Sequence, residues 1–245
     1  MKKIVTIIAS LALMATLMAC GGGDTEISEE KIETFAEDGD MYVLVLKNVQ
    51  CSSDSNVAGT LTIAAPDGES ELCTVSGSDS GLISVETDET GKTITVKAKR
   101  NVAPDSVSIF VSANVREINA SKCRLRLDAA LDYAQEVDLI LSGTFYGNIH
   151  MAANKLSAEL KGAGNLELLG SAADTRIALD GAALLDASML YAGHANVTVK
   201  GAAACEVYVS DTLDAALYGV GRILYFGEPK TVNKSVKGLG MIYAG

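Results

Sequence analysis

A short phrase built around one glycine recurs six times in the last part of the chain, between Val137 and Gly245. The gaps between successive glycines are 19, 19, 20, 18 and 19 residues. A repeat of nearly constant length in this range is typical of stacked supersecondary units, in which each copy packs mainly against its neighbours. The anchor glycines are Gly143, Gly162, Gly181, Gly201, Gly219 and Gly238.

Hydrophobic residues occupy fixed positions relative to these anchors. Two residues before each anchor stands a leucine or a valine, and further apolar positions follow four and six residues after most anchors. Apolar positions two residues apart have the period of a β-strand with one buried face. No helical pattern separates the copies. We therefore predict an all-β fold, a single-stranded parallel β-helix (solenoid) whose rungs of about 19 residues cover 118–245.

The part of the chain before the repeats, residues 41–117, is also rich in predicted strands. Short apolar and β-branched runs are separated by turn residues such as Pro66, Asp67 and Gly68. Because no proline-rich, glycine-rich or charged linker precedes the repeats, we expect one continuous domain over 41–245. The expected strands cover residues 42–46, 60–63, 82–85, 93–96 and 107–111, and a hairpin is expected over 81–97.

The chain begins with a predicted targeting segment. Lys2 and Lys3 precede an apolar run that ends in Leu17-Met18-Ala19-Cys20, which predicts a signal peptide over 1–19. The end of this run resembles a bacterial lipobox, which is cut before a cysteine that then receives lipid such as palmitate. We therefore expect Cys20 to anchor the protein to a membrane. Residues 20–40 would form an acidic, flexible tether that resembles signals for the outer surface of the outer membrane.

Composition excludes one class of partner. The formal net charge is −11, and nucleic-acid binding requires clustered lysine and arginine to neutralise phosphates. The chain has no tryptophan and only 5% aromatic residues, which favours a core of stacked aliphatic side chains over one built on large rings.

From about residue 41 to its end the sequence resembles the head GIN domain family of Bacteroidetes lipoproteins, described as auto-transporter adhesin heads. The resemblance depends on glycine-anchored phrases, on the late Tyr-Phe-Gly-Glu-Pro phrase and on the order of a strand-rich part before the repeats. Where the family has Ser-Gly-Ser-Gly at its anchors, this chain has Asp180-Gly-Ala-Ala183 and Lys200-Gly-Ala-Ala203. The resemblance implies a β-helical fold, a location in the cell envelope and an adhesin-like role. The phrases that carry it include Lys161-Gly-Ala-Gly-Asn165, Tyr218-Gly-Val-Gly-Arg222 and Ile223-Leu-Tyr-Phe-Gly-Glu-Pro-Lys230.

Four cysteines follow Cys20. Cys51 and Cys73 are 22 residues apart, about one copy, so the spacing allows either a disulfide between them or two thiols. Cys123 and Cys205 are expected in one inward-facing column about four copies apart, too far for a disulfide. Both are therefore expected to be buried thiols.

Carboxylates form the one candidate binding site that the repeat predicts. Five residues after three successive anchors stand Glu167, Asp186 and Glu206, which would stack on the outward face. Such a column could bind a divalent metal ion through oxygen ligands, or it could be a solvated acidic face balanced by the Lys161, Lys200 column. His150 and His194 have no cysteine nearby at metal-ligand spacing, so we expect solvated histidines.

No motif predicts catalysis or a cofactor. The chain lacks a nucleophile elbow, a phosphate loop and a zinc motif. We predict a non-enzymatic lipoprotein of the cell envelope, an adhesin-like or structural module that binds a surface protein or a glycan. The alternatives are a carbohydrate-binding and a polysaccharide-cleaving β-helix, and outward aromatic residues such as Tyr208, Tyr218 and Phe226 on one face would favour sugar binding.

Overall fold

The computed structural model of the protein describes residues 40–51, 56–66, 70–88, 90–132 and 134–245. Over these residues the fold is all-β: twelve strands form one mostly parallel sheet, and the only helix is the 3-10 segment η1, Ser80–Leu82. None of the described residues forms a helix of the length and apolarity that a membrane span requires. The predicted signal peptide, Cys20 and the tether lie outside the described residues, except Asp40.

The strands before the repeats are all short, and the longest strands lie within the repeats. The first six are β1 Met41–Lys47, β2 Gly59–Ala64, β3 Cys73–Ser76, β4 Ile83–Asp88, β5 Thr93–Ala98 and β6 Val107–Ser112. The last six are β7 Asn114–Leu131, β8 Glu136–Gly201, β9 Ala204–Gly219, β10 Arg222–Phe226, β11 Thr231–Gly238 and β12 Met241–Ala244.

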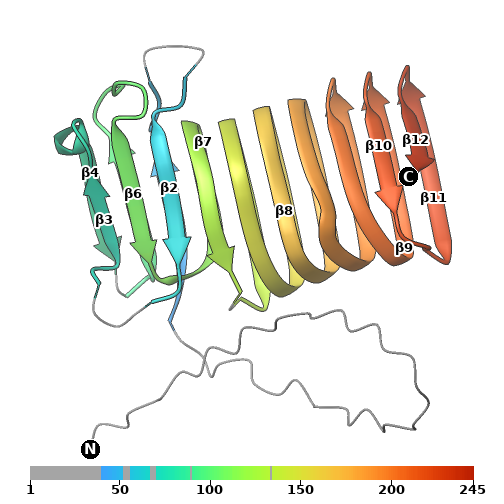
Figure 1. Ribbon diagram of the computed structural model, residues 1–245, viewed down its shortest axis with the longest axis horizontal. Helices are drawn as coiled ribbons and strands as arrows, with labels where there is room; N and C mark the ends of the chain where they lie inside the picture. Colours follow the sequence, from blue (N-terminus) through green and yellow to red (C-terminus); the bar gives the residue numbers. More distant parts are fainter. Residues whose placement is uncertain (1–39, 52–55, 67–69, 89, 133) are drawn as a thin grey trace, which may run out of the picture. The chain divides into compact units, whose positions relative to one another are not determined.

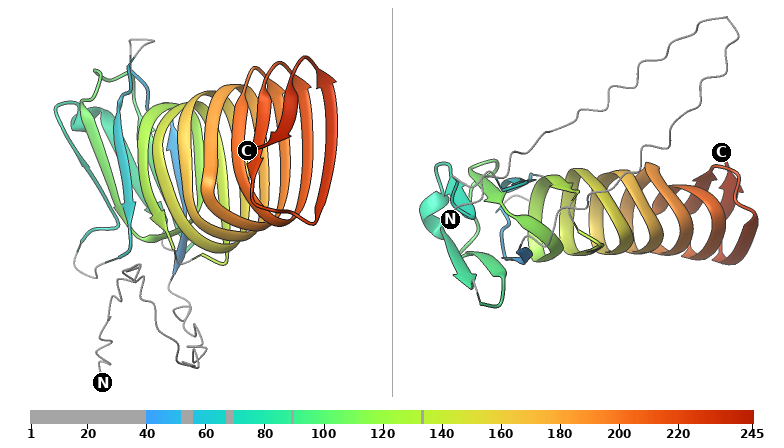
Figure 2. Two further views of the ribbon diagram at one scale, coloured as in Figure 1. Left: turned by 45° about the vertical axis from the view of Figure 1, so that its right-hand side comes forward. Right: turned by 90° about the horizontal axis from the view of Figure 1, so that it is seen from below.

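Successive copies of the repeat lie side by side in parallel register. Thr231 in β11 pairs with Thr212 in β9, and Met241 in β12 pairs with Arg222 in β10. Figure 2 shows the ribbon from β7 to β12 passing through successive turns of similar size. The sheet is not closed, because its strand order ends at β4 on one side and at β12 on the other.

The strand β8 runs unbroken for 66 residues through several copies of the repeat. Gly143, Gly162 and Gly181 lie within it and bend the backbone without ending the strand, whereas β8, β9 and β11 each end at an anchor glycine. Each anchor glycine adopts a positive φ, for example 141° at Gly162 and 139° at Gly181, a region that residues with a Cβ atom rarely adopt. Each anchor also packs against the carbonyl oxygen of the residue at the same position in the preceding copy.

The predicted aliphatic columns form the core. Of the residues two before each anchor, the first five are at most 7% exposed, whereas Val236 in the last copy is 44% exposed. Full burial of a leucine or valine side chain stabilises the fold by roughly 1.5–3 kcal/mol. The stacked columns therefore make a large hydrophobic contribution to the stability of the fold. The buried members are Leu141, Leu160, Leu179, Val199 and Leu217.

The short strands join the sheet in an order that differs from their sequence order. β1 pairs in parallel with both β5 and β7, and β2 pairs in parallel with both β6 and β7. Strand β1 therefore lies between β5 and β7. Strand β2 lies between β6 and β7, as Figure 1 shows. The predicted hairpin is confirmed, because β4 pairs antiparallel with β5; β3, which was not predicted, pairs antiparallel with β6.

The cysteines occupy positions that differ in part from those expected. Cys123 and Cys205 are buried, but Cys123 pairs with the anchor Gly143 and Cys205 pairs with Leu185, so the expected common column is wrong. Cys123 lies at the anchor position of its copy, whereas Cys205 lies four residues after the anchor Gly201. The bulge at Lys122, where φ is 52°, shifts the register by only one residue and does not account for this difference.

Cys51 and Cys73 are both thiols in the structure. Cys51 forms a bridge with Val102, whereas Cys73 pairs with Val111 near the far end of β6. The disulfide that the spacing of the two cysteines allows stays a prediction.

Candidate functional site

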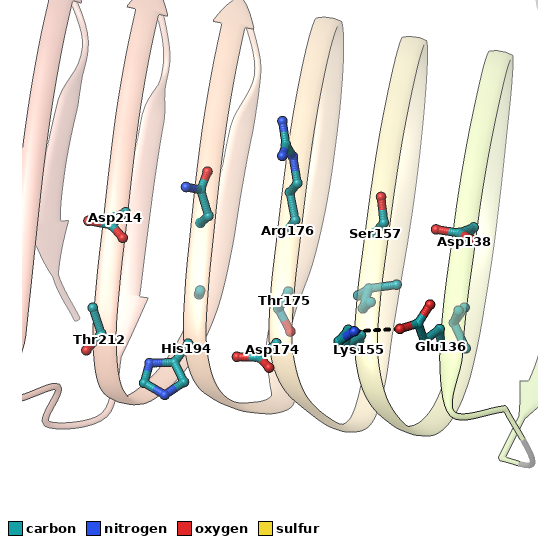
Figure 3. Close-up of a pocket in the computed structure, with 14 residues that line it drawn as sticks. Glu136, Asp138, Lys155, Ser157, Asp174, Thr175, Arg176, His194, Thr212 and Asp214 are labelled. Carbon is teal, nitrogen blue, oxygen red and sulfur yellow. Dashed lines mark hydrogen bonds and ion pairs between the residues drawn. The ribbon is translucent and has the colours of Figure 1, made fainter.

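A hollow of about 380 Å³, here the five-copy pocket, lies across β8 and β9 (Figure 3). Two rows of outward side chains line it, at seven and five residues before five successive anchors. The first row is Glu136, Lys155, Asp174, His194 and Thr212. The second row is Asp138, Ser157, Arg176, Asn196 and Asp214.

The floor between the two rows is closed by inward residues of the same strands. Val137, Leu156 and Ala195 are at most 3% exposed. Thr175 is 5% exposed, and its hydroxyl donates a hydrogen bond to the carbonyl oxygen of Ala172 at 3.2 Å. The pocket is therefore a hollow on the outer surface whose polar walls face solvent.

One end of the pocket holds an ion pair between neighbouring copies. Lys155 Nζ lies 2.6 Å from Glu136 Oε1, and both side chains are more than half exposed. The hydrogen bond from Lys155 lowers the pKa of the Glu136 carboxyl, and the same contact raises the pKa of Lys155. Lys155 and Glu136 neutralise each other, so either charge attracts a charged ligand less strongly than it would alone.

The other end of the pocket holds a chain of polar contacts. Asn233 donates a hydrogen bond to Asp214 at 2.8 Å, which connects the pocket to β11. His194 lies 3.6 Å from Asp211, a carboxylate that Lys230 approaches more closely, at 2.8 Å. The hydrogen bond from Lys230 is the main reason that the pKa of Asp211 is lowered.

The centre of the pocket presents one acidic and one basic side chain, and the acidic one, Asp174, also helps to raise the pKa of Lys155. Asp174 and Arg176 are exposed on the same strand and lie between Lys155 and His194 (Figure 3). Within the described part of the chain, the Arg176 guanidinium makes no hydrogen bond or ion pair. Its planar donors and the Asp174 acceptor are available to hydroxyl, amide or carboxylate groups of a ligand.

The predicted acidic column lies elsewhere, on the strands that follow the anchors. Asp186 pairs with Glu206, and Glu167 lines a second hollow of about 330 Å³ together with Asp186. A third hollow of about 200 Å³ adjoins it and includes Asp186, Glu206 and Arg222. The structure thus brings the three carboxylates to one face.

Each of these carboxylates has a partner of its own. Arg222 lies 3.3 Å from Glu206, and Asp186 accepts a hydrogen bond from the backbone N–H of Ser188 at 2.9 Å. Asn148, with its amide oriented to donate, reaches Glu167 at 3.0 Å. No group of three or more histidine, cysteine, aspartate or glutamate side chains among the described residues could hold a metal ion.

One of the two interpretations of these acids was a solvated face balanced by the column of Lys161 and Lys200. Lys161 lies 3.6 Å from Glu159, and the Lys161 and Lys200 positions precede the anchor, on the opposite side of the glycine bend. Arg222, three residues after its anchor, supplies the observed contact.

The histidines and aromatic residues are also placed. His150 is exposed and lies 2.8 Å from Asp132, and His194 is exposed in the five-copy pocket. Tyr208 pairs with Phe226 on one face, and Tyr191 contacts Tyr208 edge to face at 4.9 Å. Tyr218 pairs with Lys200 instead, so the three predicted aromatic residues do not share one face.

One family model matches the chain. The family model described as "Putative auto-transporter adhesin, head GIN domain" matches residues 54–229. Among curated proteins, none matches the chain.

Three similar solved structures share the fold. A "putative adhesin" from Bacteroides fragilis has 19% sequence identity and a TM-score of 0.72, and the match covers 84% of this chain and 93% of that one. A "putative lipid binding protein" from Parabacteroides distasonis has 18% identity and a TM-score of 0.55 over 85% and 94% of the two chains. A "putative adhesin" from Parabacteroides merdae has 16% identity and a TM-score of 0.51 over 84% and 92%.

Proposed function

Because the chain belongs to the head GIN domain family of putative auto-transporter adhesins, we propose that it is a non-enzymatic binding module of the cell envelope. Its partner is an extended molecule on a surface, either a glycan or a protein segment. The five-copy pocket carries this proposal, because its two polar rows repeat in five successive copies. At ~4.8 Å between neighbouring strands, a ligand that crosses them would be held over roughly 19 Å.

The repeat supports the finer description of the fold as a parallel β-helix. Its copies are in parallel register, its anchor glycines stack, and its aliphatic columns are buried. A β-helix presents identical positions of successive copies in straight rows, and this regular spacing suits a polymer with a repeating unit.

The lack of enzymatic activity is proposed from the contacts of the polar groups. A glycan-cleaving site requires one carboxyl group that holds a proton and a second that is ionised, on either side of the bond that breaks. Glu206 contacts Arg222 and Asp186 accepts a backbone N–H, interactions that use the carboxylates as acceptors. The family is likewise described as one of adhesins and not of enzymes.

We further propose that Cys20 is the lipidated N-terminus of the mature protein and attaches it to the outer membrane. The lipobox-like Leu17-Met18-Ala19-Cys20 at the end of the apolar run supports this. Growth with an alkyne analogue of palmitate should label the protein in the membrane fraction, and Cys20→Ala should remove both the label and the membrane association. Labelling of the variant would contradict the proposal.

Adhesion tests the binding role. Residues 21–245 of the protein, labelled with a fluorescent dye, would be added to intact bacteria and to cultured epithelial cells. Saturable binding to at least one of the two cell types is expected. The double variant Asp174→Ala/Arg176→Ala should lose most of this binding because it removes the central acceptor and donors of the pocket. The matched control is Lys161→Ala, outside the pocket. Failure to bind either cell type, or equal binding by the double variant, would overturn the assignment.

A further inference from the structure

A second hollow, here the Tyr146 pocket, lies on the strands after the anchor glycines and does not overlap the five-copy pocket. Its volume is about 330 Å³, at the lower end of the range for small-molecule sites. The lining includes Arg126, Tyr146, Asn148, Asn165, Glu167 and Asp186. We propose that this pocket binds a neutral or amine-bearing saccharide.

An aromatic ring stands at one side of the pocket. Tyr146 is 41% exposed and pairs with Arg126 on the neighbouring strand. The exposed ring provides an apolar surface with a polar tip, and the C–H face of a pyranose ring packs on such a surface. The five-copy pocket has no aromatic residue in its lining, which distinguishes the two sites.

Planar polar groups complete the lining of the pocket. Asn148 and Asn165 offer amide donors and acceptors, the carboxylates of Glu167 and Asp186 accept, and Arg126 donates. A sugar hydroxyl both donates and accepts, so it can satisfy an amide and a carboxylate at once. The contact of Asn148 with Glu167 at 3.0 Å holds the two side chains in a fixed relation before any ligand binds.

The pocket extends along the sheet. The adjoining hollow of about 200 Å³ shares Asn165 and Asp186 with it and adds Glu206 and Arg222. Two neighbouring hollows with shared walls suit two or more linked sugar units that lie across the strands.

Charge selects the class of saccharide. The two hollows together present the carboxylates Glu167, Asp186 and Glu206 against the guanidinium groups of Arg126 and Arg222. The carboxylates outnumber the guanidinium groups, so the two hollows carry a net negative charge. This charge disfavours uronic acids, sialic acids and sulfated sugars, because like charges placed close together repel. Neutral sugars and amino sugars fit.

Glycan binding by residues 21–245 tests the inference directly. An array of neutral, amine-bearing and acidic oligosaccharides would be probed first, and the strongest ligand would then be titrated by calorimetry. Binding to neutral or amino sugars is expected. An array without such binding, or a preference for acidic sugars, would overturn the proposal.

Variants assign the binding to the pocket. Tyr146→Ala should weaken the affinity at least about tenfold, whereas Tyr146→Phe, which keeps the ring, should remain within about threefold. Asn165→Ala provides a second test if Tyr146→Ala fails to fold, and it should also weaken binding. Equal affinities for these variants and the original chain would exclude the pocket.

This inference rests on the proposed binding role but assigns a ligand to different residues, so the two can fail separately. Lys161→Ala, outside both pockets, should leave the saccharide affinity unchanged. If Asp174→Ala/Arg176→Ala lost glycan binding while Tyr146→Ala kept it, the saccharide site would belong to the five-copy pocket and the inference would be wrong.

Discussion

Gly181 packs so closely against the carbonyl oxygen of Gly162 that a side chain on Gly181 would overlap it. The φ of Gly181 is 139°, so a Cβ atom would also be strained by the backbone conformation itself. The same relationship links each later anchor to the one before it. It explains why glycine, and no other small residue, stands at all six anchors.

Replacing one of these glycines should therefore destabilise the fold. Gly181→Ala is expected to lower the free energy of unfolding by at least about 2 kcal/mol, from backbone strain and from the displaced carbonyl. The control is Gly81→Ala, because no atom lies within 4 Å of a Cβ atom at that position. Urea denaturation followed by circular dichroism measures both, and equal midpoints would contradict the role of the anchor column.

The last copy should tolerate substitution better than the one before it. Leu217 is 0% exposed and pairs with Val236, which is 44% exposed. Leu217→Ala is expected to cost about 2–5 kcal/mol because it leaves a cavity in the core, whereas Val236→Ala should cost less than about 1 kcal/mol. The two variants change the same column, so similar losses in urea denaturation would show that burial does not determine stability there.

Stability should fall at high pH because of a buried thiol. Burial raises the pKa of Cys123 to about 11 from its usual 9.0. Below pH 9 the thiol is neutral in both the folded and the unfolded chain; between pH 9 and 11 only the unfolded chain loses the proton, which favours unfolding. The contribution lost by pH 11 is about 2 kcal/mol.

Comparison with Cys123→Ala isolates this effect from the titration of lysine and tyrosine. The variant should lose less stability than the original chain between pH 8.5 and 10.5, measured as the urea midpoint. Parallel pH profiles for the two proteins would refute a role for the thiol.

The pair in the five-copy pocket makes a prediction about titration. The hydrogen bond from Lys155 lowers the pKa of Glu136, so Lys155→Met should let this pKa rise towards its usual value. The contact stabilises the folded chain fully at a pH above the usual pKa of glutamate. This stabilisation is lost as the pH falls through the lowered pKa that Glu136 has in the folded chain. Because both side chains are more than half exposed, the effect on stability should be small.

Carboxyl NMR titration of Glu136 in the two proteins measures this shift. High salt should reduce it in the original chain, since exposed charges are screened. A pKa of Glu136 that does not respond to Lys155→Met would contradict the contact.

Much of the fold followed from the repeat because a period of about 19 residues fixes both spacing and register. The column from Leu141 to Leu217 could be predicted from apolar residues at one phase, and the acidic column from carboxylates at another. The place of β1 between β5 and β7 could not, because strand order depends on contacts between segments distant in sequence. The place of Cys123 could not be predicted either, because β7 contains no anchor glycine that would mark the phase of its copy.

The five-copy pocket was missed although its signal is present in the sequence. Polar residues recur seven and five residues before five anchors, from Glu136 to Thr212 and from Asp138 to Asp214. Outward polar residues are expected on any strand that faces solvent, so their recurrence alone does not distinguish a pocket from a hydrated face. The curvature of the backbone that hollows this face is a property of the folded chain.

The position of β1 has a mechanical consequence. Any load that reaches the folded domain through its N-terminal segment enters at Met41, in a strand flanked by β5 on one side and β7 on the other. Pulling along that strand strains the hydrogen bonds to both neighbours together, whereas pulling along a strand at the edge of the sheet would strain a single ladder. Resistance to such a load depends on how fast the structure gives way, not on its equilibrium stability. A load that enters at Met41 would therefore have to shear two ladders at once.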